Sequence, residues 1–350
     1  MIQLPRMPPR VNLASLPTPL RKLSRISQEI GGPDIWLKSD DMTGSLLSGN
    51  KVRKLEFLLA DALSKGADTI ITCGGIQSNH CRATALACAQ LGLRCELLLR
   101  EGDFPRPSGI GQSKAEGNLF LDAMAGANIH IYPKDDYVRH QLQLFREVEG
   151  KLKAEGARPY SIPTGGSNGI GVWGYLHGGL ELQQDCNSAG FVPDAVICAS
   201  GSGGTQAGLT LAQYFAVPAE KSRVLGFAVC DNSEWFNRKV ARDVAQWGEH
   251  AGLDESDRAA LAGALQISTI DDYIGPGYAK PYPQMLAMIR QLAALEGVVL
   301  DPVYTGKAFY GMVSEIRKGR FADMQNLVFV HTGGSFGLYP YARELLDSES

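Results

Sequence analysis

The sequence has no apolar run long enough to span a membrane, and its N-terminus lacks the apolar core of a signal peptide. It also lacks an excess of either charge, with 34 Lys and Arg against 37 Asp and Glu and a net charge of −3. A surface of this kind does not attract nucleic acids or anionic membranes strongly. We therefore expect a cytoplasmic protein with neither nucleic-acid nor membrane partners.

Paired cysteines are also missing. The seven cysteines are an odd number and include no C-x-x-C pair, so the sequence indicates neither a zinc site nor a disulfide framework. Most of them lie inside apolar strand or helix patterns. We expect no metal ion and free, buried thiols.

No internal repeat or long linker interrupts the 350 residues, of which 44% are hydrophobic. Strand-like and helix-like segments alternate through most of the chain. The patterns predict strands at 35–38, 68–73, 94–99, 128–132, 159–162, 194–199, 222–229 and 327–331. They predict helices at 53–65, 78–91, 113–125, 136–155, 171–187, 204–215, 234–247, 255–263, 283–296 and 306–319. This alternation is typical of an α/β fold with parallel sheets and right-handed crossovers.

The strongest local signal is a glycine-rich loop, Ser200–Gly208, between a predicted strand and an apolar helix. Glycines let a ligand approach the backbone, and amides at a helix N-terminus bind phosphate. The dinucleotide fingerprint G-x-G-x-x-G is a competing interpretation, but Gln206 stands in place of its third glycine. Thr205 adds a hydroxyl suited to a phosphate monoester. We predict a phosphate site, and a nicotinamide oxidoreductase is the less favoured alternative.

Three further glycine turns follow predicted strands, at Cys73–His80, Thr164–Gly169 and His331–Gly337. Ligands of open parallel sheets bind beyond the carboxyl ends of the strands, so these turns indicate one crevice. In the first turn, Ser78 and Asn79 lie at the expected helix start, where they could hold a carboxylate.

Lys51 lies between a glycine turn and an apolar helix. Desolvation there, with Arg53 and Lys54 as cationic neighbours, would favour the neutral amine that a nucleophile needs. The turn approximates the phosphate loop of nucleotide hydrolases, but Asn50 is inserted before the lysine and Val52 replaces the magnesium-binding hydroxyl. We therefore exclude an ATPase.

In combination, four of these segments resemble the fold type II, tryptophan-synthase-like pyridoxal-phosphate enzymes, within the branch of D-cysteine desulfhydrase and 1-aminocyclopropane-1-carboxylate deaminase. They are Ser48–Glu56, Gly74–Arg82, Gly201–Gly208 and His331–Gly334. The resemblance runs from about Leu16 to Tyr341 and implies two domains, each with an open, mostly parallel sheet flanked by helices. It implies a larger cofactor-binding domain at 1–54 and 164–350, a smaller inserted domain at 55–163, and a homodimer.

The resemblance implies pyridoxal 5'-phosphate as the cofactor. Lys51 would carry it covalently and Asn50 would hydrogen-bond its ring hydroxyl, while Tyr304 would stack on the pyridine ring. The phosphate would be held by the glycine-rich loop, through Gly201, Ser202, Gly203, Gly204 and Thr205.

For the substrate, the resemblance implies a carboxylate site made by Gln77, Ser78 and Asn79. Tyr278 matches a second active-site tyrosine. The catalytic residues implied are Lys51, Ser78, Tyr278 and Tyr304.

Two positions separate the activities of this branch. The deaminases have a glutamate after the stacking tyrosine and a leucine after the histidine of the last strand, whereas this chain has Thr305 and Thr332. A neutral hydroxyl at the ring nitrogen leaves a weaker electron sink, sufficient when a good leaving group departs from Cβ. We therefore expect a carbon–sulfur lyase that converts D-cysteine to pyruvate, ammonia and hydrogen sulfide.

Several alternatives remain beside this expectation. An L-cysteate sulfo-lyase would need a cationic partner for the sulfonate, and Lys280 beside Tyr278 is a candidate. The deaminase is disfavoured by the two threonines. A non-catalytic sensor on the same fold is disfavoured by the intact lysine, serine and tyrosines. The preference for the D-enantiomer and the dimer follow from the resemblance alone.

Overall fold

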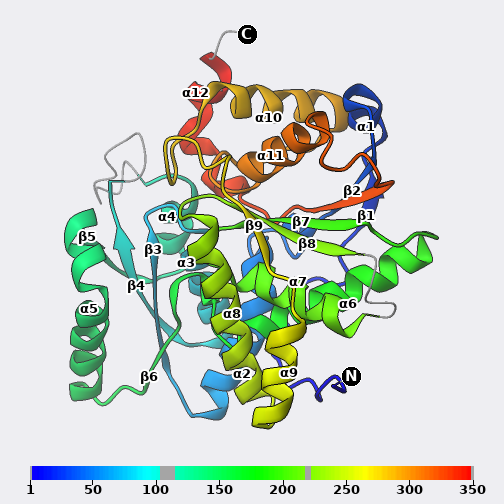
Figure 1. Ribbon diagram of the computed structural model, residues 1–350. Helices are drawn as coiled ribbons and strands as arrows, with labels where there is room; N and C mark the ends of the chain where they lie inside the picture. The colour runs from blue at the N-terminus through cyan, green and yellow to red at the C-terminus, as the bar shows by residue number, and fades with distance from the viewer. Residues whose placement is uncertain (1, 103–114, 217–221, 348–350) are drawn as a thin grey trace.

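The computed structural model describes residues 2–102, 115–216 and 222–347 (Figure 1). Its larger sheet has six strands in the order β1-β2-β10-β7-β8-β9. β1 is antiparallel to β2, and all other neighbours in this sheet are parallel. The strands are Leu20–Lys22 (β1), Asp34–Lys38 (β2), Asn326–Val330 (β10), Ala195–Ser200 (β7), Arg223–Ala228 (β8) and Ser268–Ile270 (β9).

A second, wholly parallel sheet has four strands in the order β5-β4-β3-β6. They are Asn128–Tyr132 (β5), Arg94–Arg100 (β4), Thr69–Gly75 (β3) and Pro159–Ser161 (β6). All seven residues of β3 are buried, as expected of a central strand covered on both faces.

Helices cover both faces of each sheet (Figure 1). One face of the larger sheet packs against α1 (Ser24–Ile30), α10 (Pro283–Glu296) and α11 (Thr305–Arg317), and the other against α6 (Val172–Ser188) and α7 (Gly204–Phe215). α8 (Ser233–His250) packs against α6 and α7. The smaller sheet lies between α5 (Lys134–Ala154) on one face and α2 (Asn50–Ser64) and α3 (Asn79–Leu91) on the other. The remaining helices are α4 (Gly117–Met124), α9 (Glu255–Ala264) and α12 (Ala342–Asp347).

The predicted α/β class with two mostly parallel sheets flanked by helices is confirmed. The predicted helix at 113–125 begins instead at Gly117, and residues 113 and 114 lie outside the described residues. The three-residue strands β1 and β9 were not predicted, because so short a segment carries no periodic pattern. α2 begins at Asn50, three residues earlier than predicted, and so includes Lys51 in its first turn.

The two sheets take their strands from different parts of the chain. The smaller sheet uses only residues between 69 and 161, whereas the larger one uses residues 20–38 and 195–330. This division agrees with an inserted unit, but the predicted bound at residues 54 and 55 falls inside α2, one continuous helix. The exact domain bounds stay a prediction.

Across the described residues, no helix combines the length and apolar character needed to cross a bilayer. All seven cysteines are unpaired, and all but Cys230 are buried, so the prediction of free thiols is confirmed.

Candidate active site

A cavity of about 780 Å³ lies at the carboxyl ends of strands from both sheets. Its walls include Gly75 at the end of β3, Arg100 at the end of β4 and Ser200 at the end of β7. Most of the predicted site residues line it: Asn50, Lys51, Ser78, Asn79, Gly201, Ser202, Gly203, Thr205, Tyr278, Tyr304 and Thr332. Three predicted residues are not among the lining residues: Gln77, Gly204 and Thr305.

Lys51 faces this cavity from the first turn of α2. A methyl group on Gly165 would come within 3.1 Å of the Lys51 amine, so this glycine leaves room beside the nitrogen. Burial lowers the pKa of Lys51 to about 8. The amine is therefore far more often neutral near physiological pH than an exposed lysine.

The predicted reason for the neutral amine needs a correction. Arg53 is two residues further along the helix, on the opposite face, and its guanidinium pairs with Asp40 and Glu181 instead of facing Lys51. Burial, and not a neighbouring cation, therefore lowers the pKa of Lys51.

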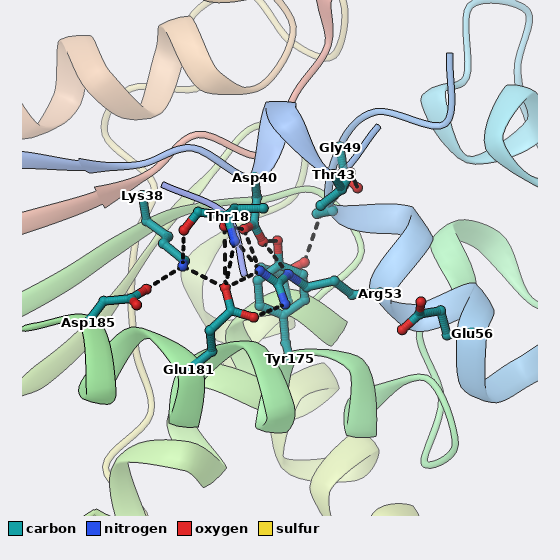
Figure 2. A network of polar contacts seen from close by, with 12 residues as sticks. Thr18, Lys38, Asp40, Thr43, Gly49, Arg53, Glu56, Tyr175, Glu181 and Asp185 are labelled. Carbon is teal, nitrogen blue, oxygen red and sulfur yellow. Dashed lines mark hydrogen bonds and ion pairs between the residues drawn. The ribbon is translucent and has the colours of Figure 1, made fainter. Parts of the chain in front are cut away.

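Arg53 lies at the centre of a buried ionic network (Figure 2). It donates to both carboxylate oxygens of Asp40 at 2.8 Å and to both of Glu181 at 2.9 Å. Lys38 bridges Glu181 to Asp185 with contacts of 2.6 and 2.5 Å. The network ties the first turn of α2 to the end of β2 and to α6, and so fixes the support of Lys51.

The charges in this network change the acidity of its members. Burial alone would raise the pKa of Asp40, but the charge and hydrogen bonds of Arg53 hold it below its usual value. Burial likewise opposes the shift at Glu181, where hydrogen bonds and charge from Arg53 and Lys38 lower the pKa to about 2. Both carboxylates are ionised at neutral pH.

The glycine-rich loop joins β7 to α7. Gly203 has a φ of +85°, which favours glycine, and precedes the first residue of α7. The hydroxyls of Ser202 and Ser167 lie 2.8 Å apart, and Ser167 also accepts a 3.2 Å hydrogen bond from the Gly204 amide. The loop therefore presents amides and hydroxyls at a helix N-terminus, the arrangement that binds phosphate.

Asn50 and Thr205 are neighbours across the cavity floor. The Asn50 side-chain amide donates a 2.9 Å hydrogen bond to the Thr205 hydroxyl, and the Asn50 backbone amide donates to the Thr332 carbonyl at 3.0 Å. This places the start of α2 beside both the glycine-rich loop and the turn after β10.

The contacts of Lys54 and Ser167 beside the glycine-rich loop were not predicted from the sequence. Lys54 is buried, and its amine donates to the Ser167 hydroxyl at 3.2 Å and to the Gly165 carbonyl at 3.3 Å. Burial holds its pKa well below the usual range. The available signal was its spacing: a residue three positions after Lys51 lies on the same helix face.

The predicted carboxylate site is only partly formed as expected. The Ser78 hydroxyl caps α3 by accepting the Cys81 amide at 3.2 Å, and Asn79 accepts from the Asn118 side chain at 3.0 Å. The Gln77 side chain instead binds the 116–118 segment, donating to the Glu116 carbonyl and accepting the Asn118 amide, each at 2.9 Å. This corrects the expectation that Gln77 faces a substrate, because both ends of its amide are engaged elsewhere.

The two tyrosines lie together. Their hydroxyls, of Tyr278 and Tyr304, are 2.6 Å apart, and the rings meet edge to face at 5.9 Å between centroids. A methyl group on Gly201 would come within 2.8 Å of the Tyr304 ring, so this glycine is needed for the close approach of loop and ring.

The two threonines that were expected to select the activity lie in different surroundings. Thr332 lines the cavity. Thr305 is fully buried at the start of α11, where its hydroxyl donates to Asp301 at 2.7 Å and accepts the Asp301 amide at 3.0 Å. This corrects the expectation for Thr305: its hydroxyl stabilises the helix start and does not face the cavity, so Thr332 remains as the candidate hydroxyl.

His80 also lines the cavity and was not predicted as a site residue. Its Nε2 lies 2.8 Å from the Thr72 hydroxyl, which donates to the Ile162 carbonyl at 2.9 Å, so Nε2 carries the proton. Burial holds the pKa of His80 well below its usual value, and the ring is neutral. Its Nδ1 has no hydrogen-bond partner among the described residues.

These residues fit pyridoxal phosphate. The Lys51 amine, with its lowered pKa, suits reaction with an aldehyde. The glycine-rich loop with Ser202, Thr205 and the neighbouring Lys54 suits a phosphate. Gly165 and Gly201 keep open the space that side chains there would fill.

The comparisons with known proteins agree with this fit. Residues 11–333 match the family model described as pyridoxal-phosphate dependent enzyme. A bifunctional D-cysteine desulfhydrase/1-aminocyclopropane-1-carboxylate deaminase of Arabidopsis thaliana is 40% identical over 335 residues, covering 94% of this chain and 79% of that protein. A D-cysteine desulfhydrase of Klebsiella pneumoniae is 39% identical, covering 95% of this chain and 96% of the relative.

Among solved structures, one described as an ACC deaminase homologue superposes with a TM-score of 0.83 at 37% identity, covering 97% of this chain and 96% of that one. With the family match over most of its length, the chain belongs to the pyridoxal-phosphate dependent enzymes and uses pyridoxal phosphate as its cofactor.

Proposed function

We propose that the protein is a carbon–sulfur lyase that converts D-cysteine to pyruvate, ammonia and hydrogen sulfide by β-elimination. The observation that carries this proposal is that the cavity lining includes Thr332, a hydroxyl-bearing residue where the deaminases of this branch are expected to have leucine. Relatives named D-cysteine desulfhydrase support it.

Bound pyridoxal phosphate supplies an electron sink for the negative charge that develops at the substrate Cα. We assign Lys51 to the proton transfer, because burial gives its amine a pKa of about 8 and it shares the cavity with Ser78 and Asn79. The amine removes the Cα proton, the Cβ–S bond breaks, and hydrosulfide leaves. The released aminoacrylate reacts with water to give pyruvate and ammonia.

The substrate carboxylate is assigned to the start of α3. Ser78 and Asn79 present their polar groups there, and the positive end of the helix dipole favours an anion. Tyr278 and Tyr304 form the facing wall, and Tyr304 packs against the phosphate loop at Gly201. This arrangement holds the substrate between the two sheets. We further infer an inserted domain near 55–163, a homodimer and a cytoplasmic location, as the resemblance implies.

Two related reactions are the competing candidates. Deamination of 1-aminocyclopropane-1-carboxylate is favoured by the names of the relatives alone, and the identity of Thr332 argues against it. Elimination of sulfite from L-cysteate is favoured by Arg100, a cationic side chain in the cavity wall. Lys280, the partner expected from the sequence, is exposed and does not line the cavity.

The test is an enantiomer-resolved assay with cofactor-loaded protein. Sulfide release is measured with D-cysteine and L-cysteine, sulfite with L-cysteate, and 2-oxobutyrate with the cyclopropane substrate. We expect D-cysteine to give the highest kcat/KM. Faster turnover of either competing substrate would refute the proposal and identify the reaction that replaces it.

A further inference from the structure

We propose that Lys307 is a positioning residue for Tyr278, holding the turn that carries this tyrosine against α11. Lys307 does not line the cavity, so it acts through the turn rather than on a ligand. What the positioned Tyr278 contributes to turnover rests on the function proposed above.

The Lys307 side chain is fully buried, and its amine reaches two backbone carbonyls of the turn. It donates to Ile274 at 2.8 Å and to Gly277 at 2.6 Å, the residue directly before Tyr278. Burial lowers the pKa of Lys307 to about 8, so the protonated form still predominates at pH 7. Hydrogen bonds from a charged donor in such surroundings are stronger than those between neutral groups.

The same helix contacts the turn a second time. Tyr304 is the N-cap of α11 and precedes Lys307 by three residues, so both lie on one side of its first turn. The Tyr304 hydroxyl is 2.6 Å from that of Tyr278. The first turn of α11 thus contacts the Tyr278 region twice. Tyr304 contacts the Tyr278 hydroxyl, and Lys307 binds the backbone carbonyl of the preceding residue, Gly277.

The backbone on the other side of Tyr278 is strained. Ala279 is buried and has a φ of +56°, the only positive φ of a non-glycine residue among those described. Such a conformation persists only where the surroundings enforce it. Its carbonyl accepts a 2.7 Å hydrogen bond from the Tyr341 hydroxyl. The turn is therefore fixed at two points. Lys307 binds the carbonyl of Gly277, the residue before Tyr278, and Tyr341 binds the carbonyl of Ala279, the residue after it.

The experiment compares three holoenzyme variants. Lys307→Met removes the donors at nearly the same length, Lys307→Gln keeps an uncharged donor, and Lys318→Met is the matched control. Lys318 is the C-cap residue of the same helix. Its amine donates to the Tyr273 hydroxyl at 2.8 Å and to Glu315, and neither bond is to the turn at 274–279.

The first readout is hydrogen–deuterium exchange of the segment around residues 272–281 without substrate. We expect Lys307→Met to raise its exchange roughly tenfold, Lys307→Gln less, and Lys318→Met to leave residues 274–281 unchanged. An unchanged exchange rate in Lys307→Met would overturn the proposal. This readout does not depend on which reaction the enzyme performs.

The second readout is a double-mutant cycle on kcat/KM with Tyr278→Phe. Lys307→Met should lower kcat/KM by roughly tenfold in the wild type but by less than about twofold in Tyr278→Phe, because its effect passes through that hydroxyl. Equal losses of kcat/KM in both backgrounds would show that Lys307 does not act through Tyr278 and would overturn the proposal. If the wild type releases no sulfide, the proposed function fails, while the exchange experiment still tests the positioning.

Discussion

The guanidinium of Arg53 contacts both carboxylate oxygens of Asp40 at 2.8 Å, two residues after the lysine that faces the cavity. Arg53 also satisfies both oxygens of Glu181. A nucleophilic amine needs a rigid support. Here an ionic network on the opposite face of the helix provides that support without adding a positive charge beside the amine.

Arg53→Met should therefore be severe. It leaves two buried carboxylates without their main partner, and such losses cost about 3–5 kcal/mol of unfolding free energy. Arg158→Met is the control, because Arg158 forms an exposed ion pair with Asp68 that water and salt screen. Urea unfolding of both variants checks this, and equal losses would contradict it.

Glu181→Gln should change the acid sensitivity of the fold. The pKa of Glu181 is about 2 in the folded protein, against 4.5 for the free group, so its stabilisation is complete above pH 4.5 and is lost as the pH falls toward 2. The variant lacks this contribution. We expect its Tm to be lower at pH 6 but to fall less than that of the wild type between pH 5 and pH 3. Parallel Tm curves would contradict the assignment.

Lys51→Ala should abolish covalent attachment of pyridoxal phosphate and sulfide release together. The attachment is measured by mass spectrometry after borohydride reduction, which does not depend on the substrate. Lys65→Ala, at the exposed end of the same helix, should keep both properties. Retained attachment in Lys51→Ala would refute the assignment of the cofactor lysine.

The rate of that attachment should depend on pH in a defined direction. The neutral amine reacts, and its fraction rises with pH through the pKa of Lys51, which is about 8 instead of 10.5. Cofactor-free protein mixed with pyridoxal phosphate should therefore reach half of its maximal attachment rate near pH 8. A midpoint above about pH 10 would show that the amine is not desolvated.

The two threonines should respond differently to substitution. Thr305→Glu brings a second carboxylate against buried Asp301 and removes two hydrogen bonds, so we expect a loss of at least about 2 kcal/mol in stability. Thr332→Leu should keep most of the stability and lower kcat/KM for D-cysteine. Urea unfolding and sulfide release measure the two effects. If the Thr305→Glu variant were as stable as the wild type, the burial of the Thr305 hydroxyl against Asp301 would be contradicted.

The sequence predicted those features that lie within one local segment. The glycine-rich loop after β7, the lysine at the start of α2 and the cap of α3 each depend on a few consecutive residues with a clear pattern. Most strands and helices were found for the same reason, because burial imposes a regular period on them.

The features that were missed depend on residues far apart in the chain. Ser167 and Lys54 meet the glycine-rich loop from other segments, and no local pattern shows such a contact. Gln77 and Thr305 occupy the expected positions, but distant or capping partners engage their side chains. A motif therefore gave the location of each residue, while the direction of its side chain depended on tertiary packing.

The position of β10 has a consequence for synthesis of the protein. It is the last strand in the sequence, yet it pairs with β2 on one side and β7 on the other, near the middle of the larger sheet. A nascent chain that has not reached residue 330 leaves both neighbours with an open edge, which is prone to aggregation. The hydrogen bond from the Asn50 amide to the Thr332 carbonyl, which joins the start of α2 to the turn after β10, can therefore form only after translation has passed Thr332.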